Sequence, residues 1–285
     1  MLGEYEEAWK ESDLAGASFQ GWPATNHRVL IRCLRGLGDA IQFLRFTSPL
    51  RERCQRVIIQ GPAALRRICG VIPGVDQVHA WEDPPPTSEY DFELECSDLP
   101  YLFRTTTASI PHQNGYIAVP ATSEAPTDTY KVGLVWASSN WNPSRALPLS
   151  ILEPLCEIPA VELFSLQQGP ELAQLAGLRN PEAIRNAAAN ALDIYDTAAI
   201  IANLDLVISV DTMVAHLAGA MGKPVWTLLH CASDWRWMVD RSDSPWYRSM
   251  RLFRQAPFEN WQAVANRVHD VLQDSILQRS RRASR

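Results

Sequence analysis

The sequence predicts an α/β protein of two Rossmann-like domains that face each other across a cleft. Short apolar runs alternate with helical patterns in both halves of the chain, which is the rhythm of parallel sheets built from β-α-β units. A stretch rich in Pro and Thr, residues 120–129, offers little to a core. We place the domain boundary there, near residue 125. Domains paired in this way bind ligands in the crevice at the carboxyl ends of their strands.

The composition is that of a globular protein and argues against one class of partner. A chain of 285 residues is long for one core and comfortable for two domains. It is 46% hydrophobic and 20% charged. Its formal net charge of -6 argues against a nucleic-acid partner, because binding to the phosphate backbone depends on positive charge.

The cysteines and the apolar runs predict a cytoplasmic protein. The six cysteines show neither CxxC pairs nor a spacing with histidines that suits zinc, so we expect reduced and mostly buried thiols. The amino terminus is acidic, unlike a secretory signal. No apolar run approaches the roughly 18 residues that cross a bilayer. We therefore expect no transmembrane segment, and any action on a membrane lipid would take place from the inner surface of the membrane.

The first half of the chain is expected to begin with a helix and to continue as alternating strands and helices. Apolar residues recur at helical spacing within residues 1–20, a helix that by itself has nothing to pack on. A strand over 28–34, a glycine corner over 35–39 and a helix from residue 41 should follow. Further strands are expected over 56–60, 77–81 and 90–95, and a helix over 63–69.

The second half repeats this pattern and is expected to end in a long helix. Strands are expected over 131–137, 161–166, 206–210, 224–229 and 250–253. Helices are expected over 148–157, 197–203 and 259–277, and a shorter one that stops at Gly222. The predicted units are therefore a helix within residues 1–20 and two Rossmann-like domains, residues 21–125 and 126–285.

Polar residues mark the corner after the apolar run 206–210. Asp211 and Thr212 lie where a strand ends and a helix begins, and the unpaired N–H groups of a helix start favour an anion. His216 follows Thr212 by one helical turn and shares its face. Either Asp211 or Thr212 could instead serve only to cap the helix. A histidine in this position is harder to explain as core filler.

A second corner follows the strand expected over 28–34. Gly36 and Gly38 allow a tight turn and a close approach of the backbone to a ligand. The third glycine of a dinucleotide-binding fingerprint is missing, so that signal is weak. Asp39 opens the next helix, and capping alone would also explain its presence.

Both corners resemble those of a known enzyme family. Residues 211–220 fit the nucleotide-sugar-binding motif D-T-x-x-x-H-x-A-x-A of the heptosyltransferase-like (family 9) glycosyltransferases, especially of the domains found C-terminal to tetratricopeptide repeats in bacteria. Residues 36–43, 132–136 and the aromatic loop between 234 and 247 resemble the same proteins. The helix within residues 1–20 resembles the last helix of a repeat array, and we expect it to be a remnant of one.

The resemblance implies a fold of the GT-B type and a division of roles. The domain over 21–125 would bind the acceptor, and the domain over 126–285 would bind the nucleotide sugar. Asp39 would be the catalytic base, and the corner from Asp211 to His216 would bind the donor.

The chain departs from the family at two places. Leu34 and Arg35 stand where relatives with the repeat array carry Glu-Gln. The charge of Arg35 could help to bind an anion, or it could mean that the acceptor pocket differs from that of the relatives. Met213 stands where the heptosyltransferases proper have glycine, and a longer side chain there would narrow the approach of the diphosphate.

Transfer of a sugar from a nucleoside diphosphate requires that the charge of the leaving group be stabilised. The chain has no Asp-x-Asp triplet to hold a divalent metal, so we expect neither a metal site nor a cofactor. The diphosphate would rest on helix N-termini and on the loop from Ser138 to Arg145, whose Arg145 carries a forked guanidinium suited to phosphate. A solvated loop arginine is the alternative. Gln167 follows a strand and is expected to reach the ribose or the base.

Three functions fit these residues. The first is a metal-independent, inverting glycosyltransferase that moves a sugar from a nucleotide-diphosphate donor to a glycan, lipid or protein acceptor. The second is a non-catalytic module that binds nucleotide sugars or serves as a scaffold beside a repeat array. The third is an epimerase or hydrolase acting on a nucleotide sugar. The tryptophans of the aromatic loop could stack on sugars, although packing is the commoner role of such residues.

Overall fold

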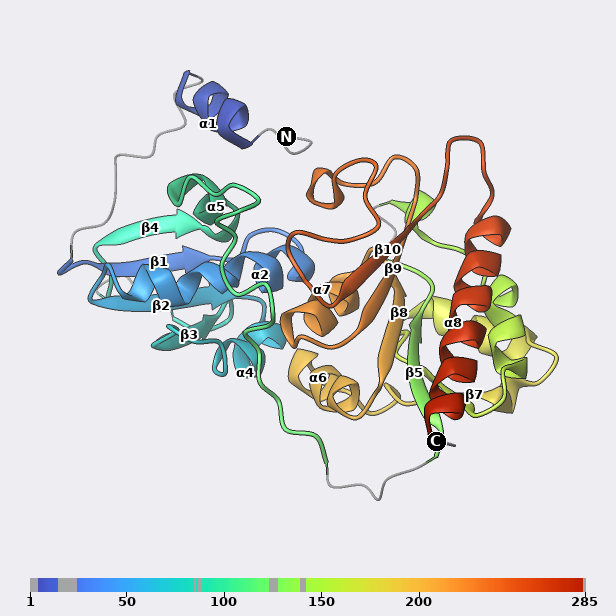
Figure 1. Cartoon of the computed structure of the whole chain (residues 1–285). Helices are drawn as coiled ribbons and strands as arrows, with labels where there is room; N and C mark the ends of the chain where they lie inside the picture. Colours follow the sequence, from blue (N-terminus) through green and yellow to red (C-terminus); the bar gives the residue numbers. More distant parts are fainter. Residues whose placement is uncertain are drawn as a thin grey trace.

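The computed structural model describes residues 5–14, 25–84, 86, 89–122, 128–138 and 142–283. Within them the chain forms two parallel sheets, one in each half, with helices packed around both (Figure 1). The predicted α/β class with two Rossmann-like sheets is confirmed. The expected boundary near residue 125 lies outside the described residues, so the limits of the domains stay a prediction.

The first sheet has four strands in the order β3-β2-β1-β4, and every neighbouring pair is parallel. The strands are β1 (Arg28–Arg32), β2 (Arg56–Gly61), β3 (Gln77–Ala80) and β4 (Phe92–Glu95). The chain adds β2 and β3 on one side of β1 and then places β4 on the other. The loops after β1 and β4 therefore diverge, and the crevice at such a reversal is where open α/β sheets bind ligands.

Short helices connect these strands. They are α2 (Leu37–Phe43), η1 (Leu44–Phe46), α3 (Thr47–Arg51), η2 (Ala63–Leu65), α4 (Arg66–Cys69), η3 (Cys96–Asp98) and α5 (Leu99–Leu102), where η marks a 3-10 helix. Helix α2 begins inside the predicted glycine corner and not after it, because Gly36 takes an extended conformation (φ -63°, ψ 154°) and serves as its N-cap. The first helical turn of α2 is therefore part of the corner itself.

The second sheet has six parallel strands in the order β10-β9-β8-β5-β6-β7. The strands are β5 (Tyr130–Val135), β6 (Val161–Ser165), β7 (Ile184–Asn186), β8 (Leu206–Val210), β9 (Val225–Leu229) and β10 (Met250–Arg254). The order reverses between β5 and β8, so the corners after these two strands face the crevice. Strand β7 was not predicted.

The helices of the second half mostly follow the prediction. They are η4 (Pro143–Arg145), η5 (Leu149–Glu157), η6 (Pro170–Gly177), η7 (Pro181–Ala183), α6 (Ile194–Ala202), α7 (Met213–Ala220), η8 (Trp235–Trp237) and α8 (Trp261–Ala283). The helix predicted over 148–157 is present as η5, which is a 3-10 helix with Pro154, a residue that has no N–H to donate, in its interior. Among the helices described here, none combines the length and apolar character that spanning a bilayer requires.

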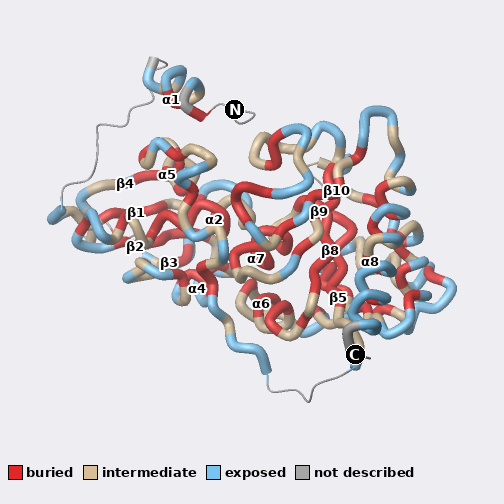
Figure 2. The backbone as a smooth tube through the Cα atoms, in the orientation of Figure 1, coloured by how far each residue is buried: buried red, intermediate tan, exposed pale blue. Residues whose placement is uncertain are grey.

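The two halves share a hydrophobic core. All five residues of β8 are buried, which explains its continuous apolar run, since a strand covered on both faces needs no alternation. Buried backbone continues from both sheets into α2 and α7, which lie between them (Figure 2). One cluster of buried side chains contains both Ile41 of α2 and Ala215 of α7. The expected mostly buried thiols are also found, at Cys33, Cys54, Cys69 and Cys96.

A tether joins the segment after α5 to the end of α7. The backbone N–H groups of Tyr116 and Ile117 both donate to the carbonyl oxygen of Ala220, at 2.7 and 2.9 Å. Gly115 lies directly on Gly222, and both have positive φ, at 113° and 69°. A Cβ atom at Gly115 would lie 2.8 Å from the Gly222 nitrogen, so the contact requires glycine there.

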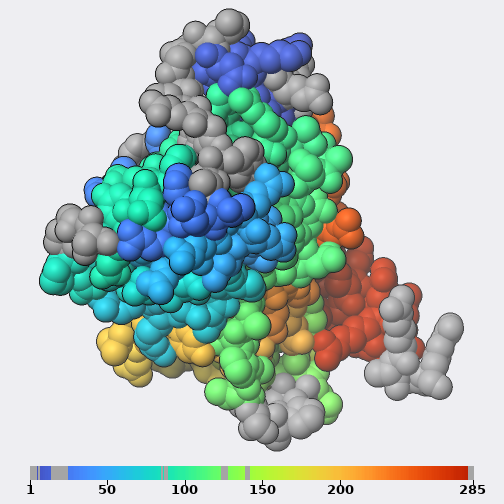
Figure 3. Space-filling model, turned by 90° about the vertical axis from the view of Figure 1, so that its left-hand side faces the viewer, coloured from blue at the N-terminus to red at the C-terminus, as the bar shows by residue number. Residues whose placement is uncertain are grey.

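Helix α1 (Tyr5–Leu14) is packed against the body of the protein, and the expectation that it has nothing to pack on is wrong. Tyr5 and Trp9 are buried, and the Trp9 indole donates to the Thr105 carbonyl oxygen at 2.8 Å. The Tyr5 ring meets Trp235 and Trp246 edge-on. In the space-filling view α1 lies on the green part of the chain near residue 100 (Figure 3). Its origin in a repeat array stays a prediction.

Candidate functional site

The two predicted corners meet where α2 packs on α7. A Cβ atom at Gly38 of α2 would lie 2.9 Å from Cδ2 of His216 and 3.6 Å from Cα of Met213. Contacts below 3 Å are not tolerated without movement, so glycine is what lets the first sheet approach the start of α7. The structure thus brings Gly36, Gly38, Met213 and His216 into one region.

Asp39 is the third residue of α2 and uses its two oxygens differently. Oδ2 accepts a hydrogen bond from the Gly36 N–H at 3.1 Å, which closes the start of the helix. Oδ1 accepts one from Nη2 of Arg236 at 2.7 Å, across the junction of the two halves. The capping alternative therefore explains one oxygen, and the other faces the second sheet.

Arg236, in η8, is a site residue that the sequence reasoning missed. Its Nε donates to Oδ1 of Asp234 at 2.9 Å, so its guanidinium joins two carboxylates. Burial alone would lower its pKa, but Asp234 and Asp39 outweigh burial and raise the pKa above its ordinary value. The side chain is therefore a permanent cation. The sequence signal for this residue is an arginine between two tryptophans, Trp235 and Trp237, in the aromatic loop.

Asp211 directly follows the buried strand β8 and carries the most covered carboxylate of this region. Its Oδ2 lies 3.3 Å from Nη1 of Arg145, and its Oδ1 lies 3.9 Å from Nε2 of His216. Burial raises the pKa of Asp211, and the Arg145 charge partly offsets this. Arg145 is thus held against the corner, and the alternative of a merely solvated loop arginine is wrong.

Thr212 is the N-cap residue of α7 but makes no side-chain cap hydrogen bond. Its Oγ1 lies 2.9 Å from Oγ of Ser209 instead. Capping by the Thr212 side chain, the alternative considered from the sequence, is therefore wrong. The N–H groups at the start of α7 remain the anion-favouring feature of this corner.

His216 is buried in a ring of aromatic and cationic groups. Its Nδ1 lies 3.0 Å from the hydroxyl of Tyr247, and its ring stacks on Trp237 with centroids 5.2 Å apart. Burial, aided by Arg236, Arg45 and Arg145, holds the pKa of His216 well below its usual range. The imidazole is therefore neutral, and it can serve a ligand by hydrogen bonding and not by charge.

Arg45 is a second residue that the sequence reasoning missed. It is only 1% exposed, and it donates to the carbonyl oxygens of Gln42 at 2.8 Å and Trp246 at 2.6 Å. Its guanidinium also lies over the Tyr247 ring, 4.6 Å from the centroid. A buried positive charge thus lies behind His216, held by carbonyl dipoles and aromatic faces.

Other predicted residues have a structural place. The Oε1 atom of Gln167 accepts the backbone N–H groups of Trp136 and Ala137, at 3.2 and 3.0 Å, so it fixes the end of β5 and is already engaged. Ser138 is the last residue described before residues 139–141. Trp237 and Trp246 are fully buried, which favours the packing role over stacking on a sugar.

The charged side chains form two layers. Asp39, Arg145 and Asp234 each keep 21% of their side-chain surface exposed. Below them, Asp211 keeps 7% and His216 3%. Solvent therefore reaches a layer of alternating carboxylates and guanidinium groups, and the corner of α7 lies beneath it.

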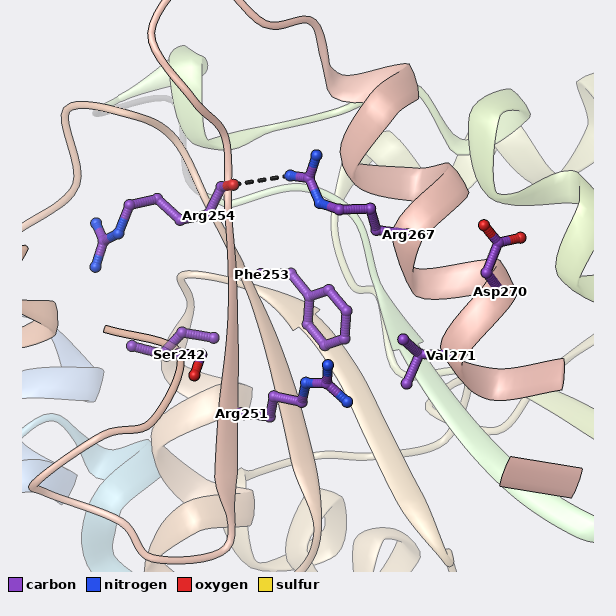
Figure 4. A pocket seen from close by; sticks show the side chains of 8 residues that line it. Ser242, Arg251, Phe253, Arg254, Arg267, Asp270 and Val271 are labelled. Atoms are coloured by element: carbon purple, nitrogen blue, oxygen red, sulfur yellow. Dashed lines mark hydrogen bonds between the residues drawn. The ribbon is translucent and has the colours of Figure 1, made fainter. Parts of the chain in front are cut away.

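A cavity of about 290 Å³ opens elsewhere, between β10 and α8. Side chains of Arg251 and Phe253 point from the strand toward the helix, and Arg267 donates to the Arg254 carbonyl oxygen at its edge (Figure 4). None of the predicted site residues lines this cavity. The candidate site is therefore identified by its charged side chains and by the contact between the two corners, and not by a cavity.

Comparison with known proteins places these features in context. Residues 169–270, which include Asp211, His216 and Arg236, match the model of "Glycosyltransferase family 9 (heptosyltransferase)". Protein FlbA of Caulobacter vibrioides is 26% identical over an alignment of 302 residues, gaps included. The alignment covers 92% of this chain and 49% of FlbA. The chain thus spans about half the length of that relative.

Solved structures resemble the whole architecture. The E. coli ADP-heptose lps heptosyltransferase II is 14% identical with a TM-score of 0.66, covering 89% of this chain and 99% of its own. E. coli heptosyltransferase WaaC with ADP-2-deoxy-2-fluoro heptose is 15% identical with a TM-score of 0.59, covering 87% and 99%. A family 9 glycosyl transferase from Veillonella parvula is 12% identical with a TM-score of 0.59, covering 82% and 87%. The chain has the GT-B fold of these proteins, and this fold together with the family match supports a glycosyltransferase.

Proposed function

We propose that this chain is a metal-independent, inverting glycosyltransferase that moves a sugar from a nucleoside-diphosphate donor to a hydroxyl group. The observation that carries the proposal is the contact between the corner that holds Asp39 and the corner from Asp211 to His216, where Gly38 lies against His216. Both corners lie where the sheets reverse their strand order. A carboxylate opposite an anion-favouring helix start is what the reaction needs. The match of residues 169–270 to family 9 supports the same activity.

The diphosphate of the donor would bind at the amino end of α7. The unpaired N–H groups there suit an anion, and Arg145 and Arg236 would add two forked cations. Asp211 and His216 are almost covered, so the corner must open before a donor reaches them. An ADP-sugar is the first donor to test, because WaaC, which has the same fold, was solved with an ADP-sugar analogue.

The chemistry would be a single displacement at the anomeric carbon. The acceptor oxygen attacks that carbon from the face opposite the diphosphate, and the bond from the carbon to the phosphate oxygen breaks. The electron pair of that bond leaves with the nucleoside diphosphate, and Asp39 takes the hydroxyl proton. The configuration of the sugar inverts, and the neutral His216 contributes a hydrogen bond. The acceptor would be a glycan, lipid or protein hydroxyl reached from the cytoplasm.

A non-catalytic module is the second candidate, and one observation favours it. Asp39 is already paired with Arg236 and bound to the Gly36 N–H, so neither oxygen is idle. In this case the fold would serve as a platform, with α1 as a point of attachment to a repeat array. An epimerase or hydrolase would share the donor site and would turn over without an acceptor.

Calorimetric titration with ADP-, UDP-, GDP- and dTDP-sugars tests the proposal. We expect at least one of them to bind, and release of its nucleoside diphosphate to require an acceptor, supplied as a cell extract. Asp39→Asn should lower that release about 10²-fold or more without weakening donor binding. Asp270→Asn, on the exposed face of α8, is the control and should change neither. If no donor binds, the transferase proposal is wrong, and release without acceptor would indicate an epimerase or hydrolase.

A further inference from the structure

We propose that Arg236 exchanges between Asp39 and the donor diphosphate, so that donor binding frees Asp39 to accept a proton. The inference rests on the glycosyltransferase function proposed above. It adds an order to the reaction, because the base becomes competent only after the donor has bound.

The geometry around Arg236 separates an anchored end from an exchangeable one. Nε is bound to Asp234 at 2.9 Å, a carboxylate two residues away in the same loop. Nη2 is bound to Asp39 at 2.7 Å, a carboxylate on the other sheet. The guanidinium also lies 5.9 Å from the ring centroids of Phe43 and Trp235, so aromatic packing limits where it can turn. Asp234 can keep the side chain in place while its outer nitrogens change partner.

Asp39 is occupied in this arrangement. Its Oδ2 closes the start of α2 through the Gly36 N–H, so Oδ1 is the oxygen left for an acceptor hydroxyl. That oxygen faces the Arg236 cation. An acceptor hydroxyl would have to bind the oxygen that Nη2 of Arg236 already occupies at 2.7 Å, so the two groups compete for Oδ1. The contact is therefore inhibitory as long as it lasts.

A diphosphate is the ligand that would displace this contact. Asp234 lies between two guanidinium groups, with Arg145 at 4.0 Å and Arg236 at 2.9 Å. A leaving diphosphate brings more negative charge than one carboxylate and offers parallel oxygens to each fork. Arg236 keeps 13% of its side-chain surface exposed, so its outer nitrogens can be reached from the solvent-facing layer. Asp39 and the diphosphate therefore compete for the guanidinium of Arg236.

A double-mutant cycle on nucleotide binding tests this competition. The probe is the nucleoside diphosphate of the donor that binds tightest in the titration panel, compared with its monophosphate. Asp39→Asn removes the competing charge and should tighten the diphosphate about twofold to fivefold, the range of one partly exposed ion pair. Arg236→Gln should weaken it about tenfold or more. In the Arg236→Gln background, Asp39→Asn should leave the affinity for the diphosphate unchanged. Each substitution should change the affinity for the monophosphate less than the affinity for the diphosphate.

Controls make each result decisive. Arg241→Gln removes an arginine of the same region that is paired with Asp243 at 2.7 Å, and it should leave diphosphate affinity unchanged. Arg236→Lys keeps the charge without the fork, should fall between wild type and Arg236→Gln, and serves if the glutamine variant does not fold. Unchanged affinity in Asp39→Asn, or equal tightening in both backgrounds, overturns the competition and leaves the glycosyltransferase proposal standing. If no nucleoside diphosphate binds the wild type, both proposals are wrong.

Discussion

The two corners use the same strand-to-helix turn but place their carboxylates at different depths. In the first, the N-cap is Gly36, and Asp39 stands in the first turn of α2 with a fifth of its side chain exposed. In the second, the N-cap is Thr212, and Asp211 precedes α7 with only 7% exposed. Burial raises the pKa of Asp211, because the surrounding protein disfavours its charged form. The more exposed carboxylate is the one placed to exchange partners during a reaction.

The comparison also shows where glycine is needed. The first corner presents backbone to its neighbour, since Gly38 lies against His216. The second corner presents side chains, from Asp211 and Thr212 to His216. The two corners can pack closely because Gly38 in the first has no side chain, and the His216 ring of the second occupies that space. Variants on each side of this contact test the relation, beginning with the largest expected effect.

Arg45→Met removes the buried guanidinium that joins the two halves behind the corners. We expect a loss of about 2–4 kcal/mol in the free energy of unfolding, because the carbonyl oxygens of Gln42 and Trp246 lose their donor in a buried place. Urea denaturation measures the loss. Arg53→Met, at an exposed arginine over the Phe103 ring, should change the stability by no more than about 0.5 kcal/mol. Equal losses would show that Arg45 does not join the halves.

Gly38→Ala places a Cβ atom against the His216 ring. We expect a destabilisation of about 1–3 kcal/mol, because that atom would lie 2.9 Å from Cδ2 of a buried side chain. Gly177→Ala is the matched control, since a Cβ atom there meets nothing within 4 Å. It should be neutral or stabilising by a few tenths of a kcal/mol, roughly the entropy that alanine removes from the unfolded chain. A stable Gly38→Ala protein would mean that the corners do not touch in solution.

His216→Gln tests the burial of the second corner through pH. The folded protein holds the pKa of His216 well below that of the unfolded chain, so the unfolded state binds the extra proton. The stability is therefore fully present above about pH 6.5 and falls as the pH drops below it, until the folded pKa is reached. Between pH 6.5 and 5 the wild type should lose up to about 1.4 kcal/mol per pH unit more than the variant. Parallel curves for the two proteins would show that His216 is accessible to protons in the folded state.

Local signals explain which elements the sequence predicted. The strand at 206–210 was predicted because a β-branched apolar run ends at a polar corner, and the structure gives β8 those limits. Strand β7 was missed because it has three residues, of which Arg185 and Asn186 are polar and exposed. The helix expected over 148–157 is a 3-10 helix, and Pro154 in its interior is the local feature that distinguishes it from an α-helix. Patterns shorter than one turn or one alternation carry too little information.

Contacts between distant residues explain what the sequence did not predict. Asp39 was predicted from the glycine corner before it and mainly from the family resemblance, but its partner Arg236 lies 197 residues away. The packing of α1 depends on Trp235 and Trp246, which no local pattern in residues 1–20 indicates. Arg45 lies in a helical stretch where an arginine is ordinarily exposed, and only the fold encloses it. Charge partners of this kind are fixed by the arrangement of the two sheets and not by neighbours in sequence.

The tether at Gly115 and Ala220 has a consequence for how the corner could admit a ligand. Helix α7 starts at the corner and ends at the tether, and its eight residues make a lever about 12 Å long. Any rotation of the first sheet about the tether would therefore displace α2 most at the far end of that lever. The two halves would then separate most at Gly38, while the hydrogen bonds of the tether to Ala220 are kept.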